Sequence, residues 1–240
     1  MAEIVKLGSL YLNGKVQDVG VKYNDEEISF GPAVPGKELY WVKVNDTLIA
    51  DRCICLRITW YDLDNRGFVF GVPIQIDGNV YLCRCLRAGS EEAVPNEWDA
   101  ALTAVGESNN LWHWEKEIFW GQDSVDGVCE FRANRGRKTA RCWGYNTPDC
   151  SMACLGWRPV LEPLGPASVT PERLLNKEVQ VFGPDYIILD GILQGVDDYD
   201  LALRTTDPLP DNCVWAKRIG NRVIVDRPSA LWVKEKRANP

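Results

Sequence analysis

The sequence of 240 residues contains a single histidine, His113, and no hydrophobic run that approaches the ~18 apolar residues needed to cross a bilayer. One histidine excludes a three-histidine iron site, and the absence of a long apolar run predicts no membrane contact. The sequence also lacks a G-x-S-x-G nucleophile elbow, a Walker loop and a dinucleotide-binding fingerprint. We therefore expect no catalytic residue of these classes, no metal ion and no cofactor.

Positive charge is scarce, because the net charge is -7 and the pI is near 4.9. An acidic chain does not neutralise the phosphates of a long nucleic acid, so extended nucleic-acid binding is excluded. One segment departs from this balance: between Cys129 and Arg158, six cations stand against two anions. This basic segment favours a small polar or anionic ligand.

Cysteine is abundant, but the nine residues are odd in number and follow no secretory signal that we recognise. Reduced thiols in the cytoplasm, or within a virion, are therefore expected. Cys53 and Cys55, like Cys83 and Cys85, are spaced two apart in apolar runs, so each pair lies on one face of a strand. The spacing does not match a zinc knuckle, and we predict that these four side chains are buried as small hydrophobic residues.

The first 165 residues predict short strands, loops and few helices. Between the strand-like runs lie turn formers, and the stretch from Asp62 to Gly67 is interpreted as a hairpin turn rather than a calcium loop, because Pro73 stands where a bidentate glutamate belongs. The clearest helix runs from Glu91 to Val105, with Pro95 in its first turn and Gly106 as its end. The predicted class is α+β.

A linker at 165–168 is predicted to separate this domain, 1–165, from a second one, 166–240. From Glu178 to Val233 the pattern indicates about five short strands, which predicts a small β-barrel in the SH3-like or Sm-like style. Exposed strand edges in such a barrel would allow a homo-oligomer.

Four stretches, in the same order, resemble the formylglycine-generating (sulfatase-modifying) enzymes, whose domain is a variant of the C-type-lectin fold. They are Glu97–Ala101, Asn110–Trp114, Arg132–Gly136 and Asn146–Arg158, similar to the E-W-x-x-A-A, G-N-V-W-E-W, R-x-x-R-G and N-T-P-D to L-G-F-R motifs of the family. The resemblance covers about a third of the chain, and only the last motif is specific. It implies a C-type-lectin-like domain, also used by phage receptor-binding proteins.

The chain departs from the family at the catalytic centre. The family holds copper with two cysteines just before N-T-P-D, and counting back from Asn146 puts those positions near Arg135 and Ala140. His113 also replaces the glutamate of W-E-W, which makes the structural calcium of the family doubtful. The resemblance therefore implies binding rather than the oxidation that the family performs.

The leading hypothesis is a non-catalytic recognition protein, encoded by a phage or prophage, that binds a sugar, nucleotide or peptide through the basic, aromatic last hairpin of its first domain. The ligand-binding residues predicted there are Arg135, Arg137, Arg141, Trp143, Tyr145, Asn146 and Asp149. Arg135, Arg137 and Tyr145 are predicted to lie on the surface, whereas Trp143, Trp157 and Arg158 could equally be buried. One alternative is an intracellular inhibitor or adaptor that blocks a host protein or sequesters an anionic signal. Another is a thiol-dependent enzyme using Cys142, Cys150 and Cys154.

Overall fold

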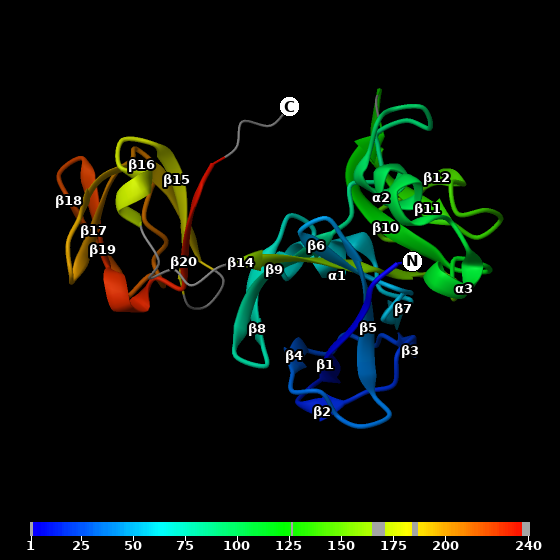
Figure 1. The fold of residues 1–240 in the computed structure, drawn as a ribbon. Helices are drawn as coiled ribbons and strands as arrows, with labels where there is room; N and C mark the ends of the chain where they lie inside the picture. The colour runs from blue at the N-terminus through cyan, green and yellow to red at the C-terminus, as the bar shows by residue number, and fades with distance from the viewer. Residues whose placement is uncertain (1, 126, 165–170, 184–186, 237–240) are drawn as a thin grey trace. The chain divides into compact units, whose positions relative to one another are not determined.

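The computed structural model describes residues 2–125, 127–164, 171–183 and 187–236. The chain divides into two compact units, Met1–Pro163 and Leu164–Pro240, each of which is considered by itself (Figure 1). The predicted linker at 165–168 and the first residue of one predicted strand, Tyr186, lie outside the described residues. None of the helices in the described part of the chain is both long enough and apolar enough to cross a membrane.

The first unit contains two sheets. The larger has eight strands in the order β2-β1-β5-β6-β14-β9-β8, with β4 also paired to β1. Its strands are β1 (Ile4–Leu12), β2 (Lys15–Val16), β4 (Ile28–Gly31), β5 (Glu38–Val44), β6 (Thr47–Ala50), β8 (Val72–Ile76), β9 (Asn79–Cys85) and β14 (Pro159–Leu164).

The smaller sheet of this unit has the order β12-β11-β10-β13-β7-β3, which places β12 at one edge. Its strands are β3 (Val21–Lys22), β7 (Cys55–Leu56), β10 (Ile118–Val125), β11 (Val128–Gly136), β12 (Trp143–Asn146) and β13 (Leu155–Trp157). The fourth family-like stretch therefore contributes both the end of an edge strand and a central strand.

The helix α1 (Trp60–Asn65) occupies the stretch interpreted as a hairpin turn, so that interpretation is wrong. Thr59 and Asp62 form a capping box, in which the Thr59 hydroxyl accepts from the Asp62 N–H and the Asp62 carboxylate accepts from the Thr59 N–H. Trp60 and Leu63 are buried on the inner side of this helix. A cap and two apolar anchors therefore outweigh the turn-forming residues that follow.

The helix predicted from Glu91 is α2 (Glu97–Val105), which begins six residues later. Asn96 caps it, and its side-chain oxygen accepts the Asp99 N–H at 2.9 Å, so Pro95 precedes the helix instead of occupying its first turn. The predicted end is correct, because Gly106 is the C-cap with a φ of 90°. A single turn, α3 (Asn109–Trp112), follows.

The prediction of an α+β class is wrong. The part of the chain that the structure describes is mostly β, with 47% of residues in strands and 12% helical, arranged as three sheets. The three α-helices among the described residues are short, since none is longer than the nine residues of α2.

The second unit is a six-stranded antiparallel sheet in the order β18-β19-β17-β16-β15-β20. It follows a 3-10 turn, η1 (Pro171–Leu174), and a second turn, η3 (Arg227–Ser229), precedes its last strand. Its strands are β15 (Glu178–Phe182), β16 (Ile188–Val196), β17 (Asp200–Arg204), β18 (Ala216–Ile219), β19 (Arg222–Asp226) and β20 (Trp232–Glu235). Lys217 and Arg218 on the edge strand β18 disfavour pairing with another chain, and the homo-oligomer stays a prediction.

Each unit has its own hydrophobic core, and aromatic side chains fill much of the first one. The four cysteines of the C-x-C pairs are buried there, which confirms the prediction made for them. Burial raises the pKa of the Cys55 thiol to about 12 and that of Cys53 and Cys83 well above the usual value. These thiols therefore stay protonated and contribute packing.

A buried arginine anchors the start of α2. Arg84 on β9 donates to both Glu97 carboxylate oxygens, at 2.6 and 2.7 Å, and to Glu162 on β14 at 2.7 Å. Burial by itself would raise the pKa of Glu97, but the hydrogen bonds and charge of Arg84 outweigh it and hold that pKa below its usual value. A depressed carboxyl pKa stabilises the folded state above the unfolded pKa, and the stabilisation is lost as the pH falls.

We therefore expect the free energy of unfolding of the first unit to decrease as the pH drops below about 5, where an unfolded glutamate begins to protonate. Urea unfolding followed by tryptophan fluorescence at a series of pH values would measure this. The Glu97→Gln variant should have a lower free energy of unfolding at neutral pH, and this free energy should decrease less steeply as the pH falls. An unchanged slope in this variant would show that other carboxylates cause the acid sensitivity.

Candidate functional site

All of the predicted ligand-binding residues except Asp149, which follows β12, belong to the hairpin of β11 and β12. In its antiparallel register Ala133 is opposite Tyr145 and Arg135 is opposite Trp143, so the side chains of these residues share one face with Phe131. The ring centroids of Phe131 and Tyr145 are 5.0 Å apart, and those of Tyr145 and Trp143 are 5.7 Å apart. The three side chains form an aromatic row, which is the name we use for Phe131, Tyr145 and Trp143.

Arg135 lies beneath this face and is only 1% exposed, so its predicted position on the surface is wrong. Its guanidinium donates to the main-chain oxygens of Ala88 and Arg141, at 2.8 and 2.9 Å, and to Asp99 of α2 at 3.0 Å. Burial lowers the pKa of Arg135 from its usual value, while the charge of Asp99 opposes that shift. Arg135 joins β11 to α2 and is not available to a ligand.

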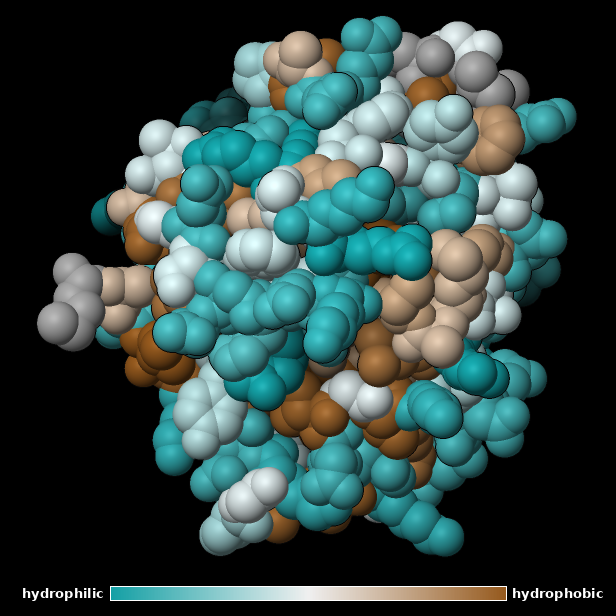
Figure 2. Space-filling view, turned by 90° about the vertical axis from the view of Figure 1, so that its right-hand side faces the viewer, coloured by the Kyte–Doolittle hydropathy of each residue, from teal (hydrophilic) through white to brown (hydrophobic). Residues whose placement is uncertain are grey.

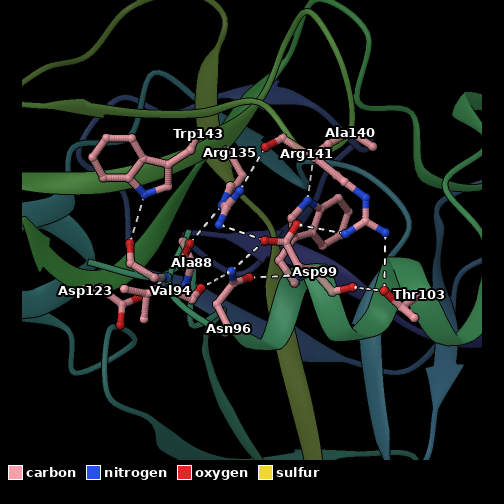
Figure 3. A network of polar contacts seen from close by, with 12 residues as sticks. Ala88, Val94, Asn96, Asp99, Thr103, Asp123, Arg135, Ala140, Arg141 and Trp143 are labelled. Carbon is pink, nitrogen blue, oxygen red and sulfur yellow. Dashed lines mark hydrogen bonds and ion pairs between the residues drawn. The ribbon is translucent and has the colours of Figure 1, made fainter. Parts of the chain in front are cut away.

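Asp99 is the centre of a network that fixes the connection between β11 and β12 (Figure 3). Besides Arg135, its carboxylate accepts from Asn96 at 2.6 Å and from Arg141 at 3.4 Å. Arg141 is exposed, but its guanidinium also contacts Glu107 at 3.0 Å and Thr103 at 3.3 Å. The charge of Arg141 is thus used within the protein.

Two tryptophans hold the same connection. Trp98 of α2 donates its indole N–H to the Ala140 oxygen at 2.7 Å. Trp143 is half-buried and donates to the Gly89 oxygen at 2.9 Å, while Asp123 accepts from the Ala88 and Gly89 N–H groups at 2.6 and 3.0 Å. Figure 3 shows these bonds converging on the hairpin from α2 and from the segment that precedes it. The aromatic row therefore stands on a rigid base.

The remaining predicted residues are more accessible. Tyr145 is 51% exposed, and Arg137 and Asp149 are exposed. Asn146 is half-buried and accepts from Asn134 at 3.1 Å. The side chains of Arg137 and of the adjacent Lys138 form no ion pair with any residue that the structure describes. Tyr145 and the two cations are the groups that remain available for binding.

Sequence reasoning missed a second group of aromatics on the opposite face of the hairpin. The Arg132 guanidinium lies over the Trp60 ring, 4.4 Å from its centroid. The ring centroids of Tyr61 and Phe70 are 6.3 and 6.4 Å from that of Trp60, and both rings meet it edge-on. Tyr61 is 49% and Phe70 is 66% exposed. The adjacent aromatics Trp60 and Tyr61 were the sequence signal that could have revealed this group, but the helix α1 that contains them was not predicted.

The space-filling view does not single out either group. On the face seen in Figure 2, hydrophilic residues predominate and hydrophobic areas appear between them. The candidate site is defined by its side-chain contacts and charges.

His113 belongs to a separate polar cluster. An arginine can only donate, so the contact of 3.0 Å between the Arg52 guanidinium and Nε2 makes Nε2 the acceptor and places the proton on Nδ1. Nδ1 faces Asp51 at 3.3 Å. In the part of the chain that the structure describes, no three histidine, cysteine or acidic side chains are grouped so that they could hold a metal ion.

The sequence left open whether Trp157 and Arg158 are buried, and the structure answers this. Trp157 and Arg158 are fully buried. Arg158 donates to the Ala50 and Asp51 oxygens at 3.3 and 2.9 Å, and its guanidinium lies over the rings of Trp98 and Phe119, 5.1 and 4.8 Å from their centroids. Both residues support the core.

Comparison of the chain with protein-family models, with curated proteins and with solved structures finds no match. The resemblance to the formylglycine-generating enzymes thus gains no support, and the function is argued from the site alone.

Proposed function

We propose that the first unit is a non-catalytic recognition module that binds an extended segment of a partner polypeptide along β12. The carrying observation is the aromatic row, held rigidly at the open edge of a sheet next to two unpaired cations. Of the sugar, nucleotide and peptide ligands expected from the sequence, a peptide uses all of these features.

The edge of β12 supplies main-chain hydrogen bonds. Gly136 donates its N–H to the Cys142 oxygen at 3.0 Å, so alternate residues of β12 direct their main-chain groups at β11. Trp143 and Tyr145 direct theirs outward, and no described strand pairs with that edge. A peptide can add as a further strand there, and main-chain bonds would provide affinity.

The side chains supply selectivity. Apolar side chains of the added strand would pack on the aromatic row, of which Tyr145 is the most exposed ring. Arg137 and Lys138 extend from the end of the hairpin where β11 turns towards β12, and their unpaired charges favour an acidic residue in the partner. The expected sequence preference is apolar residues at alternate positions with acidic residues on one side.

The same surface serves the adaptor alternative, in which the bound segment belongs to a host protein. We place this activity in the cytoplasm, where the partly buried Cys142, Cys150 and Cys154 would remain reduced. The thiol-enzyme alternative is less well supported, because His113, the one histidine of the sequence, contacts Arg52 and Asp51 and is not paired with any thiol that the structure describes as its general base.

The test is selection of random displayed peptides on the full chain, followed by affinity measurements on variants. Tyr145→Ala should weaken the best peptide about tenfold, equivalent to about 1.4 kcal/mol. Tyr61→Ala is the matched control, because that ring is equally exposed on the other face, and it should change the affinity less than about twofold. Equal losses in both variants, or selective binding of glycans instead of peptides, would refute the proposal.

A further inference from the structure

The second unit contains a groove that the proposed function does not use. It has a volume of about 560 Å³, within the range of small-molecule sites. Ile192 and Gly191 of β16 form part of its lining, together with Arg204 of β17, Asn221 before β19, and the segment Thr205–Asp207. Arg218 holds that segment by donating to the main-chain oxygens of Thr205 and Asp207.

An unusual charge arrangement lies at one edge of the groove, where Arg204 of the lining is next to a second arginine outside it. Arg204 is directly opposite Arg222 on the neighbouring antiparallel strand, so both side chains project to the same face. Both are exposed, and neither guanidinium forms an ion pair or hydrogen bond with any described residue. Like charges in directly opposite positions destabilise a sheet. Two free guanidiniums held side by side are suited to a phosphate, whose oxygens accept bidentate hydrogen bonds.

One wall of the groove is acidic, but the carboxylate of Asp190 already has hydrogen-bond partners within the protein. Asp190 accepts from Gln180 at 3.0 Å and from Lys236 at 2.6 Å, so both its oxygens have partners. The carboxylates of Glu178 and Asp207 accept no side-chain hydrogen bond from a described residue. Free carboxylates next to a phosphate site would repel a second anion and would accept hydrogen bonds from hydroxyl groups.

We propose that this groove binds a phosphorylated sugar, either free or as the ribose phosphate of a nucleotide. Arg204 in the groove and Arg222 beside it hold the phosphate at the edge of the groove, with Thr206 and Asn221 of the lining as neutral donors. Glu178 and Asp207 accept from the sugar hydroxyls. The site lies in a different unit from the β12 edge, so it does not depend on the function proposed above.

The experiment is a titration of the full-length, isotope-labelled protein at low ionic strength, followed by amide chemical shifts. The probes are ribose 5-phosphate, ribose and inorganic phosphate. Ribose 5-phosphate should shift the amides of Thr205, Thr206 and Asn221 and bind more tightly than inorganic phosphate, while ribose should cause no shift. Adenosine monophosphate in place of ribose 5-phosphate distinguishes a nucleotide from a free sugar phosphate.

Variants assign the roles. The double variant R204Q/R222Q should bind ribose 5-phosphate at least about tenfold more weakly, because charged hydrogen bonds are lost. Its thermal midpoint should not fall, since the change removes a repulsion. The matched control K217Q/R173Q removes the same charge from exposed positions of this unit outside the groove and should bind normally.

Glu178→Gln keeps both arginines and tests the acidic wall. This variant should bind ribose 5-phosphate more weakly than the wild-type protein does, and inorganic phosphate at least as tightly. Equal affinity in R204Q/R222Q and the wild-type protein would overturn the proposal, and so would an equal loss in K217Q/R173Q, which would indicate charge attraction without a site. A Glu178→Gln variant that binds both probes as the wild type does would remove the role of the carboxylates.

Discussion

Asp99→Ala is expected to lower the free energy of unfolding of the first unit by about 3–5 kcal/mol, the range for leaving a buried charge without its partner. Arg135 is 1% exposed and has Asp99 as the carboxylate within ion-pair distance, at 3.0 Å. The main-chain oxygens of Ala88 and Arg141 would remain as acceptors, but they carry no compensating charge. The same change removes one of the acceptors of Asn96 and one of those of Arg141.

Chemical unfolding monitored by tryptophan fluorescence measures this loss, with Asp149→Ala as the control. Asp149 is exposed near the same hairpin and forms no described ion pair, so its replacement should change the stability by less than about 0.5 kcal/mol. Asp99→Ala should also weaken peptide binding, because the connection that positions β12 is loosened. If the two variants were equally stable, Arg135 would not depend on Asp99 for its burial.

Local signals in the sequence predicted local structure well. The strands at Glu178–Phe182, Asp200–Arg204 and Arg222–Asp226 follow apolar runs between turn residues, whereas β20 (Trp232–Glu235) was not among the five strands predicted. Gly106 marks the end of α2 because a positive φ favours glycine there. Patterns of this kind involve neighbours in the sequence, so they can be read without the fold.

The candidate site depended on contacts between distant residues and was predicted only in part. The hairpin and Tyr145 were predicted from the resemblance to the formylglycine-generating enzymes, but contacts with residues outside the hairpin determine the role of each arginine. Arg135 is buried because Asp99, 36 positions away, accepts from it, and Arg141 is occupied because Glu107 lies beside it. Arg137 has no such partner among the residues that the structure describes. Identical side chains in one short segment thus have different roles, and the sequence does not distinguish them.

Trp98→Ala is expected to destabilise the first unit by about 3–5 kcal/mol, the usual range for truncating a buried aromatic side chain. Trp98 is fully buried, with the rings of Trp112 and Phe119 both at 4.9 Å and the Arg158 guanidinium at 5.1 Å. Its loss would remove one of the two rings that compensate the buried Arg158 charge. The Ala140 oxygen would also lose its donor.

Trp98→Phe separates these contributions, because it keeps an aromatic ring and removes the indole N–H. It should cost about 1–3 kcal/mol, the penalty for a buried polar group left unpaired. Hydrogen exchange adds a local readout: the Cys142 amide, which donates to the Thr139 oxygen within the same connection, should lose protection in both variants. A Trp98→Phe protein with wild-type stability and protection would mean that ring packing alone positions the hairpin. The rigid base of the aromatic row would then not require the bond to Ala140.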